Sequence, residues 1–221
     1  MNHVVLLGDS IFDNAHYVPG GPPVIEQLRK TLPEGWLATL LAIDGNVTSD
    51  VTRQLQKLEP DASHLVISVG GNDALQQSFI LAQPVQSIRD AMVHLATISA
   101  RFQTTYRQML AEVLSHRLPT IVCTIYDAIP NLGDAEKAAL SHFNDVILQE
   151  AISAGIPVID LRSVCNEATD YSQVSPIEPS VHGGEKIVQA VATAIRQHDF
   201  KAGKCTIYST CSNSISLMQV N

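Results

Sequence analysis

Short apolar runs and longer amphipathic stretches alternate along most of the chain. Five largely apolar runs have the length of buried strands, and they span residues 4–7, 37–43, 65–69, 120–124 and 156–161. Segments with helical periodicity lie between and after them, at about residues 22–30, 48–58, 84–117, 134–154 and 183–198. This alternation predicts an α/β fold in which helices cover both faces of a five-stranded parallel sheet.

Residues 84–117 form the longest amphipathic stretch. Apolar residues recur there at steps of three and four, as on one face of a helix. The stripe consists of Val85, Ile88, Met92, Leu95, Phe102, Tyr106, Met109 and Val113. Methionine and aromatic side chains at this spacing belong to a core far more often than to a binding site, so we predict that the stripe is buried.

The length and composition of the chain suit a single domain. It has 221 residues, and 45 % of them are apolar, which is enough for a full core. We assign residues 1–200 to this domain. Residues 201–221 are rich in Ser, Thr, Asn and Cys and show no clear period. We interpret them as a C-terminal extension that is either loosely docked or disordered, and we assign them no function.

Charge and cysteine content exclude several classes of function. The formal net charge of −8 argues against binding to nucleic acid or to an anionic membrane surface. No apolar run approaches the ~18 residues of a membrane-spanning helix, and no signal segment precedes the first strand. The four cysteines lack a paired metal-binding spacing. We therefore expect a soluble, cytoplasmic protein with no metal and no cofactor; its oligomeric state is not defined by the sequence.

Small polar clusters follow the first three predicted strands. Ser10 follows the first strand, Gly45 the second and Asn72 the third. Because the carboxyl ends of parallel strands meet at one edge of a sheet, these clusters are expected to converge. Acyl transfer requires a nucleophilic hydroxyl and N–H donors aimed at the developing oxyanion. The simpler alternative is that Asp9 and Ser10 only cap a turn.

The three clusters, in this order, resemble the motifs of the SGNH (GDSL) hydrolase superfamily. Gly8-Asp9-Ser10 is similar to its first block, Gly45 with its neighbours to the second, and Gly70 to Asp73 to the third. The resemblance extends over about residues 3–198. It implies a three-layer α/β/α, doubly wound, flavodoxin-like fold. It also implies that Ser10 is the nucleophile and that the Ser10 N–H, the Gly45 N–H and the Asn72 amide form the oxyanion hole.

The last block departs from the pattern of this superfamily, which is Asp-x-x-His followed by Pro. The local match is Ser175-Pro176-Ile177-Glu178-Pro179. This register puts Glu178 at the position of the histidine and Ser175 at the position of the aspartate. His182 comes four residues later, about one helical turn from Glu178 if Pro179 begins a helix.

Three interpretations of this block follow. In the first, His182 is the base for Ser10 and Glu178 orients it. In the second, Glu178 itself takes the proton, which requires burial to raise the pKa of its carboxyl group. In the third, no base operates and the protein only binds. We favour His182 because an imidazole suits neutral pH without a special environment; a helix-start histidine with no chemical role is the competing explanation.

The sequence thus predicts a metal-free serine hydrolase that cleaves a small-molecule carboxylic ester through an acyl-enzyme on Ser10. The loops between the blocks are short and partly apolar, which favours a short acyl group. The rival is a catalytically impaired protein of the same fold that binds a small acid or ester. Nucleotide binding is disfavoured because the first turn carries Asp9 and lacks a glycine-rich phosphate loop.

Overall fold

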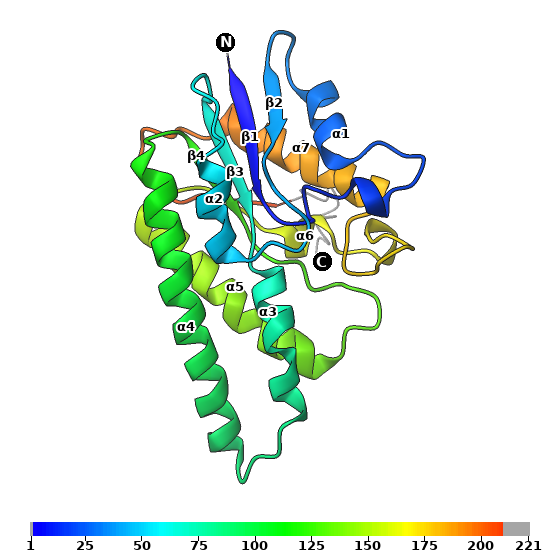
Figure 1. Cartoon of the computed structure of the whole chain (residues 1–221), viewed down its shortest axis with the longest axis vertical. Coiled ribbons are helices and arrows are strands. Elements are labelled where there is room, and N and C mark those ends of the chain that lie inside the picture. The colour runs from blue at the N-terminus through cyan, green and yellow to red at the C-terminus, as the bar shows by residue number, and fades with distance from the viewer. Residues whose placement is uncertain (1, 210–221) are drawn as a thin grey trace, which may run out of the picture.

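A computed structural model describes residues 2–209 and has a six-stranded, wholly parallel sheet (Figure 1). The strand order is β2-β1-β3-β4-β5-β6. The strands span His3–Gly8 (β1), Leu37–Leu40 (β2), His64–Ser68 (β3), Thr120–Cys123 (β4), Val158–Ile159 (β5) and Ile207–Tyr208 (β6). The first five strands have the flavodoxin-like order, so the predicted doubly wound α/β fold is confirmed.

Strand β1 lies at the centre of the fold because it pairs with β2 on one side and β3 on the other. All six of its residues are buried. Val4 and Leu6 face one layer of helices, and Val5 and Leu7 face the other. A strand covered on both faces reads as a continuous apolar run, which is why the sequence pattern located it.

The first face of the sheet is covered by α1 (Val24–Thr31), α6 (Leu161–Val164) and α7 (Val181–Gln197). Helix α1 packs against α7, and both contribute apolar side chains to the core on this face. The short 3-10 helices η1 (Ala15–Tyr17) and η4 (Ala168–Asp170) lie in the loops that precede α1 and α7. These loops are the ones that carry parts of the candidate site.

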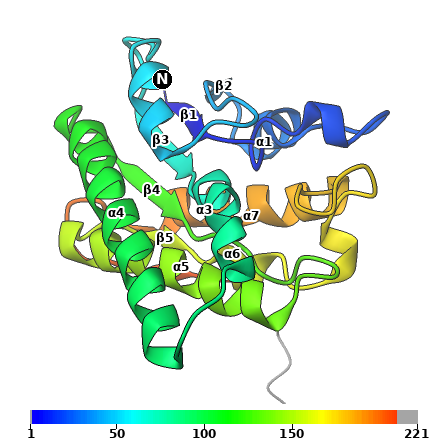
Figure 2. The same cartoon turned by 60° about the horizontal axis from the view of Figure 1, so that its bottom comes forward.

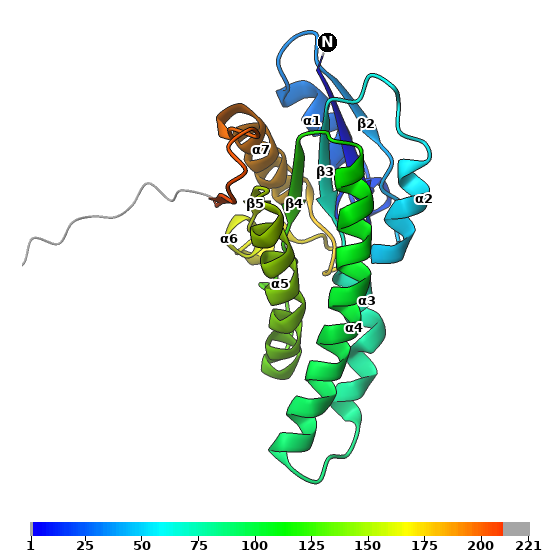
Figure 3. The ribbon, with the colours of Figure 1, turned by 90° about the vertical axis from the view of Figure 1, so that its left-hand side faces the viewer.

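The second face is covered by α2 (Val51–Leu55), α4 (Ile88–Ser115) and α5 (Asp134–Ala154). A 3-10 helix, η2 (Thr48–Asp50), leads into α2. Helix α3 (Gly71–Gln77) and η3 (Ser78–Ala82) follow β3 and lie alongside α4 and α5 (Figure 2). Together, α3, η3 and the first turns of α4 project beyond the carboxyl ends of the strands (Figures 1 and 3).

Helix α4 is only half buried, in contrast to the predicted continuous stripe. The helix begins at Ile88, where Ser87 caps it by accepting a hydrogen bond from the Asp90 N–H. Its second half packs into the core through Phe102, Tyr106, Met109 and Val113. In its first half, Ile88 and Met92 are 82 % and 50 % exposed. The expectation that the whole stripe is core is therefore wrong for this half.

The C-terminal segment differs from the sequence prediction in one respect. Residues Ile207–Tyr208 form β6, which pairs in parallel with β5 through Val158↔Ile207 and Ile159↔Tyr208. The sheet therefore has six strands rather than five, and the sixth comes from the segment we assigned to an extension. A two-residue strand without apolar periodicity gives no pattern that could be recognised. Within the assigned extension, residues 210–221 lie outside the described residues.

The sequence predicts no membrane-spanning helix. No helix within residues 2–209 is long and apolar enough to cross a membrane.

Candidate active site

The candidate site begins at the end of β1, where the chain turns sharply at Gly8. Gly8 has φ +123°, a conformation that favours glycine. A Cβ atom at this position would lie only 1.8 Å from the Ser68 carbonyl oxygen. Asp9 then donates its N–H to the same Ser68 oxygen over 3.1 Å. The close approach of β1 and β3 thus fixes where the following residue, Ser10, leaves the sheet.

Ser10 is 6 % exposed and lies in the turn that follows. The Asp9 carbonyl oxygen accepts hydrogen bonds from the N–H groups of Phe12 and Asp13, which closes this turn. Within the described residues, the Ser10 N–H donates to no protein acceptor. This N–H group therefore remains available to a ligand, as the resemblance to the hydrolase motif requires of an oxyanion-hole donor.

Asp9 is an ionisable group in the site, which the sequence analysis considered as a turn residue and as an argument against nucleotide binding. Its side chain is 3 % exposed, and its Oδ1 accepts a hydrogen bond from the Ile11 N–H at 3.2 Å. Burial raises the pKa of Asp9 to about 8, and the carboxylate of Glu178 adds to that rise. Near neutral pH the protonated, uncharged form of Asp9 is therefore favoured, which limits the negative charge beside Ser10.

Gly45 lies in a turn that follows the extension of β2. The Asn46 N–H donates to the Ile43 carbonyl oxygen, and Gly45 has φ +78°, as the third residue of a type II turn requires. In the described part of the chain, the Gly45 N–H has no protein acceptor. Gly45 is exposed, and it does not line the cavity that contains Ser10.

Two hydrogen bonds join the Gly45 turn to the loop that follows Ser10. The Asp44 N–H donates to Asp13 Oδ2 over 3.0 Å, and the Tyr17 hydroxyl donates to Asp44 Oδ2 over 2.7 Å. The carboxylate of Asp44 raises the pKa of Tyr17 to about 12 because it accepts this hydrogen bond. The two loops are thus positioned relative to each other.

Asn72 lies in the first turn of α3, directly after Gly70 and Gly71. Its Nδ2 donates one hydrogen to the Asn46 carbonyl oxygen at 2.9 Å, which holds the amide against the Gly45 turn. A carboxamide carries two N–H bonds, so the second remains for an oxyanion. Asn72 lines the same cavity as Ser10. The structure thus brings Ser10 and Asn72 to one cavity and joins Asn72 to the Gly45 turn.

Gln54 in α2 connects the turn at Gly8 with the Gly45 turn, and the sequence analysis did not identify it. Its side chain is 2 % exposed and binds both backbone groups of Gly8, accepting from the N–H at 2.8 Å and donating to the oxygen at 2.7 Å. It also donates to Asn46 Oδ1 at 2.9 Å. Nothing in the sequence distinguishes Gln54 from a surface glutamine, because a partner 46 residues away gives no local pattern.

Glu178 is brought to Ser10 from the other end of the chain. It is 5 % exposed, and its Oε2 is buried without a hydrogen-bond partner among the described residues. Burial raises the pKa of Glu178 from 4.5 to about 7. The hydrogen bond with the Ser10 side chain acts in the opposite direction, and the Asp44 carboxylate adds to the rise. This is the environment that a carboxylate base near neutral pH requires.

The backbone around Glu178 is held by buried contacts on three sides. The Ser172 N–H donates to the Glu178 oxygen at 2.8 Å, and the Tyr126 hydroxyl donates to the Ile177 oxygen at 2.7 Å. Asn14, in the loop after Ser10, donates through Nδ2 to the Pro179 oxygen at 3.2 Å. Ser10 and Glu178 are therefore positioned by a direct link between their own loops.

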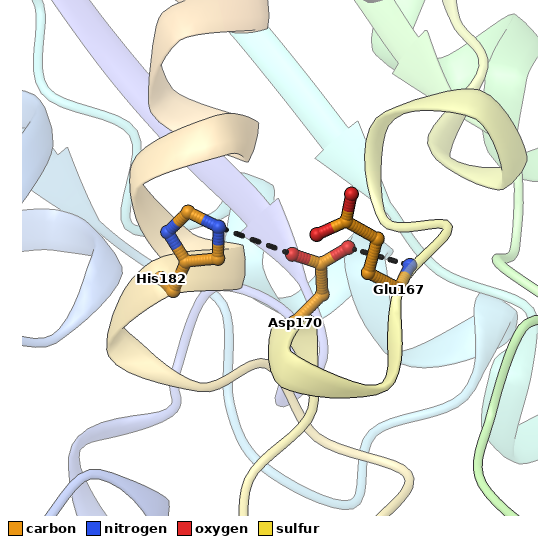
Figure 4. Close-up of side chains that lie close together, drawn as sticks. All are labelled: Glu167, Asp170 and His182. Atoms are coloured by element: carbon orange, nitrogen blue, oxygen red, sulfur yellow. Dashed lines mark hydrogen bonds and ion pairs between the residues drawn. The ribbon is translucent and has the colours of Figure 1, made fainter.

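His182 lies outside this arrangement. It is in the first turn of α7, with a side chain that is 54 % exposed. Its ring points to Asp170, with 3.8 Å between Nε2 and Oδ1 (Figure 4). Its Nδ1 lies 3.8 Å from Glu185 Oε2. His182 does not line the cavity that contains Ser10, Asn72 and Glu178. The pair that we favoured as base and orienting residue is thus separated.

The acidic groups near His182 are already paired with a lysine. Asp170 is fully buried, and both of its carboxylate oxygens accept from Lys186 Nζ, at 2.9 and 2.7 Å. Glu167, Asp170 and His182 bring potential metal-ligating atoms within 4.8 Å of one another. Because the Lys186 ammonium group already neutralises Asp170, this cluster has a structural explanation and does not resemble a preformed cation site.

A largely apolar cavity of about 170 Å³ opens from Ser10. Ser10, Asn72 and Glu178 lie in its wall together with Asp9. Away from these residues the lining is almost wholly apolar and comes from α3, η3, α4, α5 and the loop after β4. It includes Leu75, Ile80, Leu95, Ile98, Ile125, Ile129, Leu140 and Phe143.

Comparison with models of protein families gives a match over most of the chain. A model of the GDSL-like lipase/acylhydrolase family matches residues 6–200. No curated protein sequence matches the chain.

Several solved structures share the fold at low sequence identity. The extracellular lipase of Streptomyces rimosus is 21 % identical, with a TM-score of 0.62 over 87 % of this chain and 100 % of that one. A lipase from a goat rumen metagenome is 22 % identical, with a TM-score of 0.69 over 88 % of this chain and 97 % of that one. An acetyl xylan esterase from Geobacillus stearothermophilus is 19 % identical, with a TM-score of 0.62 over 87 % and 94 %.

Proposed function

Because the chain belongs to the GDSL-like lipase/acylhydrolase family, we propose that it is a carboxylic ester hydrolase with Ser10 as nucleophile and Glu178 as general base. Lipases and esterases among the structural neighbours support ester hydrolysis in general. The assignment of the base rests on one observation. Glu178 is buried beside Ser10 with its pKa raised to about 7, whereas His182 faces Asp170 and solvent.

The proposed reaction runs through an acyl-enzyme. The Glu178 carboxylate accepts the proton of the Ser10 hydroxyl while Oγ attacks the ester carbonyl carbon. The tetrahedral intermediate collapses, and the protonated Glu178 gives its proton to the leaving alkoxide. A water molecule then attacks the acyl-enzyme, with Glu178 again accepting a proton, which returns to Ser10 as the carboxylic acid departs.

The oxyanion formed in each half-reaction requires hydrogen-bond donors. The free N–H groups of Ser10 and Gly45 and the second amide hydrogen of Asn72 are the proposed donors. The neutral state of Asp9 supports this assignment, because an ionised carboxylate at that position would repel the oxyanion. By raising the pKa of Asp9, burial thus removes a negative charge that would oppose formation of the oxyanion.

The apolar cavity supports an acyl chain longer than the short group that the sequence suggests. Its lining beyond Ser10 offers contacts to methylene groups, each of which contributes about 0.8 kcal/mol when it is removed from water. We therefore propose that p-nitrophenyl octanoate is a better substrate than p-nitrophenyl acetate. Replacing Ala139, which lines the cavity, by Trp should remove this preference, while Ala138→Trp at its exposed neighbour should not.

Covalent labelling tests the nucleophile. A fluorescent organophosphonate should label the wild-type protein and fail to label Ser10→Ala, and the same variant should lose turnover of p-nitrophenyl esters. Thermal unfolding of both proteins establishes that they are folded. A folded wild-type protein that is neither labelled nor active would contradict the proposal. It would favour the alternative, a protein of this fold that binds a small acid or ester without cleaving it.

A further inference from the structure

The segment that projects beyond the sheet is unusual in charge and in exposure. We call residues 74–93 the apolar tip; it comprises most of α3, all of η3 and the first turns of α4. No charged residue occurs from 74 to 88, although the chain as a whole has a net charge of −8. The charged residues that border this stretch are Asp73 and Arg89, one of each sign. The apolar tip is thus a neutral region on an acidic protein.

The apolar tip also concentrates exposed apolar side chains. Seven of the thirteen large apolar side chains that are exposed in the described residues lie between Leu75 and Val93. Phe79 is 59 % exposed and Ile88 is 82 % exposed. No residue from Gly71 to Arg101 is buried, so this part of the chain packs only loosely on its own protein. A concentration of exposed apolar side chains in one segment is typical of an interaction site.

The apolar tip is continuous with the cavity that leads to Ser10. Leu75 and Leu81 are exposed on the outside and also line the cavity, together with Ile80 between them. The cavity wall between these residues and Ser10 is mainly apolar; besides Asp9 and Glu178, Glu136 is the charged residue that lines it. The tip narrows to the turn before α4 at one extreme of the molecule (Figures 1 and 3).

We propose that the apolar tip inserts into the surface of a neutral lipid aggregate and delivers an acyl ester from it into the cavity. The delivery step rests on the proposed function, whereas the surface binding does not. A projecting apolar end that has no charged residue from 74 to 88 suits a fluid, neutral lipid surface, which adapts to its shape. The net charge of −8 disfavours an anionic surface and leaves apolar contact as the source of binding.

The test measures binding apart from catalysis. In the full chain, Ser10→Ala keeps the lipid intact, and flotation with phosphatidylcholine vesicles measures partitioning. We expect the protein to float with these vesicles, to be insensitive to added salt and to bind more weakly when phosphatidylglycerol is included. Adding Phe79→Ser and Ile88→Ser should reduce the partition coefficient at least tenfold. The melting temperature should not fall, because both side chains are exposed.

A matched control uses exposed apolar residues away from the apolar tip. Ile152 and Ile207 are 58 % and 52 % exposed, and Ile152→Ser with Ile207→Ser should leave partitioning unchanged. Failure of the protein to float, or an equal loss in the control, would overturn the proposal. So would a dimer in light scattering that dissociates in the tip variant, since a second copy would then cover this surface. Vesicle binding by a wild-type protein without esterase activity would contradict only the proposed function.

Discussion

Glu178 and His182 are four residues apart, and the structure gives them opposite environments. Glu178 is 5 % exposed and lies beside Ser10, where burial raises the pKa of its carboxyl group to about 7. The His182 side chain is 54 % exposed and lies 3.8 Å from a carboxylate that Lys186 already neutralises. The residue with the usual chemistry of a base is therefore outside the site, and the residue with the weaker intrinsic basicity is inside.

The course of the backbone determines which of the two side chains, Glu178 or His182, lies beside Ser10. Asn14 and Tyr126 bind the carbonyl oxygens on either side of Glu178, at Pro179 and Ile177, and so fix this residue against Ser10. Ser180 then caps α7 by accepting from the Gly183 N–H, which turns the chain away before His182. Side-chain chemistry alone favours His182, whereas the register of the Pro-containing block favours Glu178.

Replacing Glu178 and His182 separately by neutral side chains is the strongest test of which residue is the base. Glu178→Gln should lower kcat/KM for a p-nitrophenyl ester by about 10³-fold, within the usual range for loss of a general base. His182→Gln should stay within about twofold of wild type. Steady-state kinetics on both folded variants measures the ratio. A large loss in His182→Gln with an active Glu178→Gln would restore the histidine as base.

Substitutions around His182 should instead change the free energy of unfolding. Asp170→Asn leaves Lys186 without its buried partner and should lower the free energy of unfolding by about 3 kcal/mol. Glu185→Gln, at the exposed carboxylate beside the same histidine, should change it little. Urea unfolding measures both. If Asp170→Asn retained full stability but lost activity at a temperature where it is folded, Asp170 would belong to the catalytic group after all.

Substitution of Asn72 should have a smaller effect on activity and should also lower stability. Asn72→Ala removes one proposed oxyanion donor and should lower kcat by about 10²-fold. It also removes the hydrogen bond to the Asn46 oxygen and should lower the free energy of unfolding by about 1 kcal/mol. Kinetics and thermal unfolding on the same preparation separate the two. A loss of stability alone would assign Asn72 to the Gly45 turn rather than to catalysis.

The pH dependence of activity and of stability also distinguishes Glu178 from His182 as the base. Since Glu178 acts as a base only when ionised, kcat/KM should fall about tenfold per pH unit below pH 7, and it should fall again above about pH 8, where Asp9 ionises beside the oxyanion. The profile should be unchanged in His182→Gln. Ionisation of the buried Glu178 opposes folding, so wild type should lose stability relative to Glu178→Gln between pH 4.5 and 7, and the difference should then stay constant. An activity midpoint that moves in His182→Gln would contradict this assignment.

Much of the fold could be predicted from apolar periodicity. Strands covered on both faces, such as β1 and β3, appear as continuous apolar runs, and their alternation with helices implies parallel pairing. Two features could not be predicted. Strand β6 has only two residues, and the exposed first half of α4 has the same apolar spacing as its buried half. Periodicity identifies an apolar helix face but does not identify what covers that face.

The candidate site could be predicted only in part, for a related reason. Ser10 and Asn72 follow strands and therefore lie at the carboxyl edge of the sheet once the strands are parallel. Glu178 lies in a loop whose path depends on long-range contacts, including the hydrogen bond from Asn14 to the Pro179 oxygen. The pKa of Asp9 depends on burial by several elements at once. The register of the Pro-containing block indicates Glu178 as a candidate, but neither the path of its loop nor the pKa of Asp9 is encoded in a local pattern.

The hydrogen bond between Asn14 and Pro179 joins loops 165 residues apart in the chain, and this has a consequence during synthesis. The serine loop leaves the ribosome well before Glu178. Until the second half of the chain has folded onto the first, Ser10 lies next to no base. Non-local closure of this kind is slow compared with helix formation. On the proposed mechanism, a partly made chain therefore has a serine that is not activated, and hydrolysis requires the folded domain.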